Sequence, residues 1–156
     1  MSNPSAKRRP SLLERISGPK AVPLAALVQK GEAAAERVQE SFGDFLEQRI
    51  GELIQARFRL TEAPDAVPEA AWEQFYALVV DLRGSAAMAG RRGLGPVCFS
   101  LETLLEEHVR DSRAVAVAAS HIDALLLLSA GRESESAAQR LGAELAQAVA
   151  RLPRRA

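Results

Sequence analysis

The sequence predicts an all-α protein, and three observations lead to this prediction. Alanine, leucine, glutamate and arginine, which all favour helices, dominate its 156 residues. Aromatic residues make up only 4% of the chain, and no long alternating run of Val, Ile, Thr and Tyr proposes a sheet. Apolar residues instead recur at intervals of three and four in several long segments. With 47% hydrophobic residues, the chain is expected to fold as one helical domain with a tail.

The first 31 residues are predicted to form a flexible basic arm. Residues 1–20 contain five basic side chains and one acidic side chain, a net charge of +4 in a chain that is neutral overall. Prolines and glycines interrupt this segment, and Gly31 is expected to weaken any helix that begins after Pro23. Because most arms of this kind are simply solvated, we do not expect nucleic acid as a partner.

Two long amphipathic helices are expected next. The first covers residues 32–60 and ends before the proline-containing segment 64–68. Pro68 suits the first turn of the second helix, because its missing N–H would have no partner there, and this helix is expected to run to about residue 89. The apolar stripes consist of Val38, Phe42, Phe45, Leu46, Ile50, Leu53 and Ile54 in the first helix and of Trp72, Phe75, Val79, Leu82 and Ala86 in the second.

Three further helices are expected to complete the domain. The first of them begins near Pro96, the second covers residues 112–130, and the third covers residues 134–152. Gly131 is expected to be a left-handed cap, and residues 153–156 are expected to form a tail. Short turns between long helices favour antiparallel neighbours, so we predict an up-and-down bundle over residues 32–152. Its remaining core positions are Val97, Leu101, Leu104, Leu105 and His108, then Val115, Ala118, Ile122, Leu125 and Leu126, then Leu141, Leu145 and Val149.

Helical geometry places Val80 away from the core stripe of the second helix. At 100° per residue, the core positions cluster on one face and Val80 lies well over 90° from their centre. A solvent-facing strip is therefore predicted around this valine. Gly84, one turn further on, lies on the same strip. In a helix interior glycine lowers stability by about 0.5–1 kcal/mol relative to alanine, so we expect another interaction to compensate for this loss. The other members of the strip are Glu73, Tyr76, Arg83 and Ala87.

The run from Leu78 to Gly90 resembles the signature helix of the histidine phosphotransfer domains of bacterial phosphorelays. Such domains carry the phosphorylated histidine, then any residue, an aliphatic residue, Lys or Arg, Gly and a small residue. Leu82, Arg83, Gly84 and Ser85 fill the last four places, and Val80 stands where the histidine would be. The segments Met88-Ala89-Gly90, Leu101-Glu102-Thr103-Leu104-Leu105-Glu106 and Ser120-His121-Ile122-Asp123-Ala124-Leu125 extend the similarity, which covers roughly residues 32–152.

This resemblance implies a fold and a partner. It implies a four-helix bundle with an accessory helix, which docks a response-regulator receiver domain or a histidine kinase. Arg83 would supply a cation for phosphate, and Gly84 would leave room for the active site of the partner. Valine has no atom that can accept a phosphoryl group, so the protein is expected to be a competitor or adaptor and not an enzyme. The expected docking residues are Tyr76, Val80, Arg83, Gly84 and Ala87.

Two alternatives stay open at this point. The chain could belong to an active phosphorelay lineage in which valine has replaced the histidine at Val80. It could also be a plain helical oligomerisation or interaction bundle, in which Gly84 would mark a helix contact. The oligomeric state and the identity of the partner do not follow from the sequence.

Other residues offer little chemistry. Neither His108 nor His121 is followed by the cation and glycine of the motif; we expect His121 to be packed and His108 to gain from a helix dipole when charged. Cys98 is expected to be a small packed thiol, and no second Cys or His stands at metal-ligand spacing. No nucleophile and base with a helper is visible. No metal, cofactor or hydrolase activity is therefore predicted.

The remaining expectations concern the cellular location. A single cysteine allows no internal disulfide and suits a reducing compartment. No stretch of about 18 uncharged apolar residues occurs, which is roughly the length a membrane span needs. We therefore expect a cytoplasmic protein without a membrane segment.

Overall fold

The protein is all-helical in the part that the computed structural model describes, residues 22–131 and 133–156. No strand occurs in these residues, so the predicted fold class is confirmed. The predicted basic arm lies outside the described residues as far as residue 21. The helices are α2 (Leu24–Glu62), α3 (Glu69–Met88), the 3₁₀ helix η1 (Arg92–Leu94), α4 (Gly95–Glu107), α5 (Ser112–Ser129) and α6 (Glu135–Ala150).

Helix α2 begins at Leu24, eight residues before Glu32, where the sequence predicts its start. The carbonyl of Pro23 accepts the first helical hydrogen bonds, from the N–H groups of Ala26 (2.9 Å) and Leu27 (3.2 Å). The helix continues through Gly31, because one glycine costs only about 1 kcal/mol and good helix formers surround it. Residues 24–31 are therefore helical, whereas the sequence predicts a flexible arm there. A compact unit begins at Val38 and extends to Ala156.

The other helices begin close to the predicted residues. Pro68 has extended backbone angles and precedes the first residue of α3. The side chain of Asp111 accepts hydrogen bonds from the N–H groups of Arg113 and Ala114 and so caps α5. Ser134 caps α6 in the same way. Gly131 has a φ of 69°, which confirms its left-handed conformation after α5.

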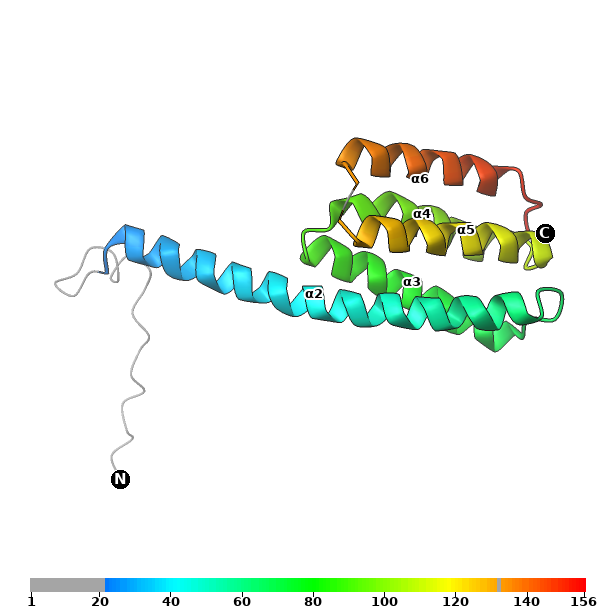
Figure 1. Cartoon of the computed structure of the whole chain (residues 1–156), viewed down its shortest axis with the longest axis horizontal. Helices are drawn as coiled ribbons and strands as arrows, with labels where there is room; N and C mark the ends of the chain where they lie inside the picture. The colour runs from blue at the N-terminus through cyan, green and yellow to red at the C-terminus, as the bar shows by residue number, and fades with distance from the viewer. Residues whose placement is uncertain (1–21, 132) are drawn as a thin grey trace, which may run out of the picture. The chain divides into compact units, whose positions relative to one another are not determined.

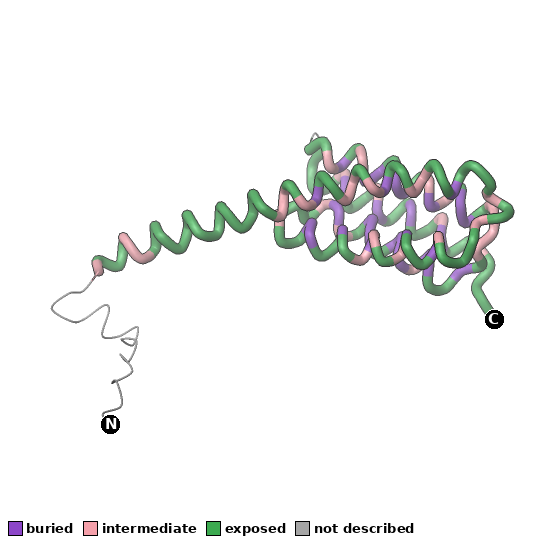
Figure 2. The backbone as a smooth tube through the Cα atoms, turned by 90° about the horizontal axis from the view of Figure 1, so that it is seen from below, coloured by how far each residue is buried: buried purple, intermediate pink, exposed green. Residues whose placement is uncertain are grey.

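Five helical segments surround the core of the compact unit (Figure 1). Helix α4 contacts α3, α5 and α6, and α5 also contacts α6. The C-terminal part of α2 reaches α3 through Arg49 and Asp81 (3.9 Å) and reaches α5 through an ion pair between Arg57 and Asp123. Buried residues line the inner faces of these helices (Figure 2).

Most of the predicted core positions are buried, and all the exceptions except Ile50 lie towards the ends of the stripes. Val38 and Ile54 of α2 are exposed, contrary to the prediction. Phe42, Phe45, Ile50, Leu126 and Leu141 are half-buried. The core of α3 is as predicted and also includes Ser85, whose hydroxyl donates a hydrogen bond to the Asp81 carbonyl (2.7 Å).

The last four residues form more than a tail. The N–H of Val109 donates to the carbonyl of Pro153 (2.9 Å), and the N–H of Arg155 donates to the carbonyl of Glu107 (2.8 Å). This pairing covers His108, which is fully buried, and its Nδ1 lies 3.1 Å from the Leu152 carbonyl oxygen. His108 therefore anchors the C-terminal segment from the protein interior, a role that the sequence did not predict.

Helix α5 is long and apolar enough to cross a membrane, judged by its length and composition alone. Its mean hydropathy is 1.3, and 44% of its residues are buried in the protein interior. The core helix of a soluble protein passes the same test, so this is a weak indication of a membrane span.

Candidate functional site

The five predicted docking residues form one strip along α3, which we call the docking strip (Tyr76, Val80, Arg83, Gly84 and Ala87). Arg83, Gly84 and Ala87 are exposed, whereas Tyr76 and Val80 are half-buried. Val80 is therefore partly covered, although it is not among the residues packed against the core. Helix α3 lies between α2 and α4, so its covered face is wider than the single stripe of core residues.

Gly84 has no structural reason to be glycine within the described part of the chain. A Cβ atom added at this position would have no atom within 4 Å outside its own helix, and no positive φ is found there. The alternative in which Gly84 marks a helix crossing is thus not supported inside one copy of the chain. Gly43 and Gly51 of α2 share this open environment.

Arg83 is engaged by a carboxylate of the neighbouring helix. Its Nε lies 2.8 Å from Oε1 of Glu102, and the two side chains are 46% and 9% exposed. No aligned hydrogen bond reaches this oxygen, so the contact is an ion pair. Burial raises the pKa of Glu102, and the charge of Arg83 only partly opposes this. The cation that the resemblance assigns to phosphate is therefore already paired.

The same face of α4 borders the rest of the docking strip. The hydroxyl of Tyr76 donates a short hydrogen bond to Glu106, and this bond raises the pKa of Tyr76. Phe99 lies three residues before Glu102 and is 62% exposed. Sequence reasoning missed these three residues of α4. Their spacing of three and four, which puts them on one helical face, was the available signal.

A serine–histidine pair in the core was also missed. Oγ of Ser100 and Nε2 of His121 are 2.9 Å apart, and Nδ1 of His121 is 2.8 Å from the carbonyl oxygen of Val117. A carbonyl can only accept, so the Nδ1–H of His121 donates to it. In the neutral ring, Nε2 then accepts a hydrogen bond from the Ser100 hydroxyl. Burial lowers the pKa of His121 and so favours this neutral form. Both residues are sealed in the core, so no substrate reaches this base and nucleophile.

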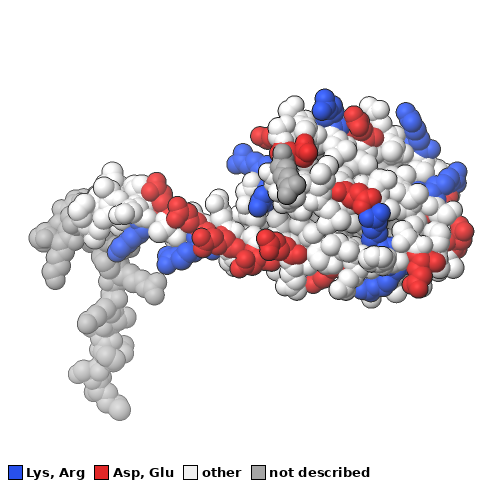
Figure 3. Space-filling model, viewed as in Figure 1, with Lys and Arg blue, Asp and Glu red and all other residues white. Residues whose placement is uncertain are grey.

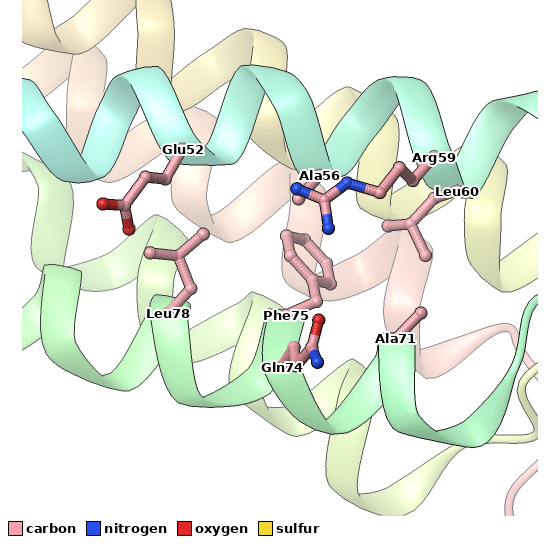
Figure 4. A pocket seen from close by; sticks show the side chains of 8 residues that line it. All are labelled: Glu52, Ala56, Arg59, Leu60, Ala71, Gln74, Phe75 and Leu78. Carbon is pink, nitrogen blue, oxygen red and sulfur yellow. The ribbon is translucent and has the colours of Figure 1, made fainter.

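Cys98 and a small hollow between α2 and α3 were also considered as sites by their chemistry and size. Cys98 is buried, which raises the pKa of its thiol to about 12. In the residues the structure describes, no three side chains of His, Cys, Asp or Glu gather as metal ligands. A hollow of about 100 Å³ between α2 and α3 is smaller than typical ligand pockets of about 300–1,000 Å³. Its lining, drawn in Figure 4, consists of Glu52, Ala56, Arg59, Leu60, Ala71, Gln74, Phe75 and Leu78.

Two larger hollows lie elsewhere on the compact unit. One of about 280 Å³ is bordered by Arg91, Arg92 and the start of α6, and two glutamates share its rim. Another of about 330 Å³ lies between α2 and the end of α5 and includes Gly43 and Gly51. Neither contains a residue of the docking strip. The strip with its α4 border therefore remains the best candidate site.

Comparison of the chain with family models, with curated proteins and with solved structures gives no match.

Proposed function

We propose that this protein is a non-phosphorylatable histidine phosphotransfer protein that docks a receiver domain or a histidine kinase. In this proposal the compact unit is a four-helix bundle of α2, α3, α4 and α5, with α6 as the accessory helix. The contacts of α4 with α3 and α5, and the ion pairs from α2 to the same two helices, are consistent with such a ring of helices. The protein would act as a competitor or adaptor in two-component signalling.

The position of the open Gly84, one turn after Val80 in the docking strip, carries this proposal. A glycine in the interior of an exposed helix lowers stability by about 0.5–1 kcal/mol, and here no contact within the chain compensates. A partner that approaches the backbone of α3 closely would supply the compensation. The glycine also lies one turn after Val80, where the resembling family places its reactive residue.

The chemistry of the surface favours docking without phosphate transfer. Val80 offers only methyl groups, and the nearby Ser85 hydroxyl is buried and bonded to the helix backbone. The Arg83 charge is balanced by Glu102. Phe99 adds exposed apolar area beside the strip. A partner would therefore be held by apolar contact and by the shape of the surface.

Replacing Val80 with aspartate is expected to weaken partner binding at least about tenfold, equal to about 1.4 kcal/mol. The new carboxylate would have to lose its hydration in the interface. Val80 is half-buried but is not among the residues packed against the core, so the variant should fold. Val109→Asp is the matched control, because Val109 is also partly exposed and lies outside the strip.

The measurement begins with a pull-down from lysate of the source cell, analysed by mass spectrometry. Titration of the recovered receiver domain or kinase, in purified form, against the wild type and both variants then follows. Equal affinity of all three proteins would contradict the assignment of the docking strip. Appearance of an acid-labile phosphoprotein in Val80→His, with the cognate kinase present, would instead favour the active lineage.

Replacing Gly84 with alanine is expected to separate stability from binding. The variant should gain about 0.5–1 kcal/mol in the free energy of unfolding, because alanine favours the helix and has open space there. It should bind the partner more weakly, since the added methyl group stands in the interface. Gly51→Ala, which is equally exposed and open, should gain the same stability and leave the affinity unchanged. Chemical unfolding and titration of both variants measure this, and equal affinities for the two would contradict the role of Gly84.

A further inference from the structure

An apolar seam runs along the first half of α2. Its members recur at intervals of four and three residues, which is the heptad spacing of coiled coils. The bulky residues Leu24, Val28 and Val38 on this seam are 47–64% exposed, although they are large and hydrophobic. The complete seam consists of Leu24, Val28, Gly31, Ala35, Val38, Phe42 and Phe45.

This part of the helix buries few of its own side chains. The residues from Leu24 to Arg37 precede the compact unit, and nearly all of them are exposed (Figure 2). A lone helix of about 12–15 residues is only marginally stable in water. Gly31 weakens it further. A partner that covers the seam would supply the missing stabilisation.

The charges of the segment leave the seam open to an identical helix. In heptad terms the positions beside the seam are Ala25, Leu27, Glu32, Ala34, Gln39 and Ser41, with a single charge among them. Acidic side chains follow one another along α2 in Figure 3. Three of them, Glu36, Glu40 and Asp44, occupy heptad positions on the far side from the seam. Two copies can therefore meet along the seam with little repulsion between like charges.

We propose that a second copy of this chain covers the seam, in an antiparallel pair of α2 helices. With Ala33 level with its counterpart, Leu24 lies opposite Phe42, and Val28 lies opposite Val38. The small residues Gly31 and Ala35 then meet in the middle, where they allow the backbones to approach closely. From Leu24 to Phe42, large side chains thus meet large ones and small meet small, which is the self-complementarity that a twofold interface requires.

The charged residues agree with this register. Lys30 stands level with Glu36 of the other copy, and both lie at outer heptad positions, so neither adds repulsion at the seam. A membrane surface fits the segment less well. Helices that lie on membranes carry mainly Lys and Arg on their polar face, whereas this face carries four acidic residues and only two basic ones from residue 24 to residue 45.

Sedimentation of the full-length chain over a range of concentrations tests the proposal. The wild type should associate to a dimer, and Val28→Glu should shift the dimer dissociation constant at least tenfold towards monomer. Gln29→Glu adds the same charge one residue away, off the seam, and should leave the dimer intact. Circular dichroism should show the compact unit folded in both variants. A wild type that stays monomeric, or that sediments with anionic vesicles as a monomer, would overturn the proposal.

Disulfide trapping tests the antiparallel register. Chains with Val28→Cys and chains with Val38→Cys are mixed and oxidised. The buried Cys98 thiol stays protonated and does not compete, because its pKa is raised to about 12. The register predicts mixed disulfides between the two kinds of chain. Homodimeric disulfides in their place would overturn the antiparallel pairing.

Discussion

Replacing Ser100 with alanine is expected to lower the free energy of unfolding by about 1–3 kcal/mol. The Ser100 hydroxyl lies 2.9 Å from Nε2 of His121, and both side chains are buried. Without this hydroxyl the ring nitrogen would remain in the core as an acceptor with no donor. The cost is the lost hydration of a buried polar atom, which exceeds the net value of one hydrogen bond.

A double variant distinguishes this effect from simple loss of packing. In Ser100→Ala/His121→Leu both partners are apolar, so no polar side-chain atom of the pair is left without a partner. Its cost should therefore be smaller than the sum of the two single costs. Ser120→Ala is the matched control. The hydroxyl of Ser120 is exposed and donates to the Ala116 carbonyl (3.1 Å), so its loss should change stability by less than about 0.5 kcal/mol.

The same pair predicts a dependence of stability on pH. Burial lowers the pKa of His121 in the folded state, so the unfolded chain binds a proton at a higher pH than the folded chain does. The stability from the neutral ring is complete above the unfolded pKa of about 6.5. It is lost as the pH falls from there towards the folded pKa. Urea unfolding at several pH values should show this loss in the wild type and a reduced loss in the double variant, and equal slopes would contradict it.

The sequence predicted the helices well because the signals that define them are local. Pro68 and Gly131 act within one helical turn, and the apolar stripe of α3 follows from its spacing alone. The start of α2 was predicted wrongly, because the helix cost of Gly31 is smaller than the stabilisation from the helix-forming residues around it. The helix propensity of one glycine therefore does not decide where a long helix with many good helix formers begins.

The candidate site was predicted only in part, because its residues Phe99, Glu102 and Glu106 come from a different helix. The exposure of Arg83, Gly84 and Ala87 follows from the geometry of α3. That Arg83 meets Glu102 depends on how α3 and α4 pack, which no periodicity within one helix reveals. The pairing of Ser100 with His121 has the same origin, since the two residues lie on neighbouring helices.

Replacing Arg83 with alanine is expected to lower the free energy of unfolding at neutral pH by about 1–3 kcal/mol. Removing one partner of a buried ion pair typically costs about 3–5 kcal/mol. The cost is smaller here because the Arg83 side chain is nearly half exposed and water screens the pair. What remains is a carboxylate of Glu102 that is almost fully buried and has lost its cation.

Acid should remove much of this cost. Burial already raises the pKa of Glu102 above its ordinary value, and loss of Arg83 would raise it further. The folded state therefore holds this proton more tightly than the unfolded state. The contribution of protonated Glu102 to stability is complete below its unfolded pKa of about 4.3. This contribution is lost as the pH rises through the pKa that Glu102 has in the folded state. Wild type and Arg83→Ala should thus differ less near about pH 4 than near about pH 7.

Two further variants decide whether the carboxylate is the cause. Arg83→Ala/Glu102→Gln should recover much of the lost stability at neutral pH, because no buried charge remains. Arg113→Ala removes an exposed arginine that lies 2.7 Å from Asp111, and it should cost less than about 1 kcal/mol. A cost for Arg83→Ala that does not change with pH would show that packing of the arginine stem, and not the charge of Glu102, is responsible. If the pH dependence is found, Arg83 serves first to neutralise Glu102, and a surface with its cation so engaged is better suited to holding a partner than to handling phosphate.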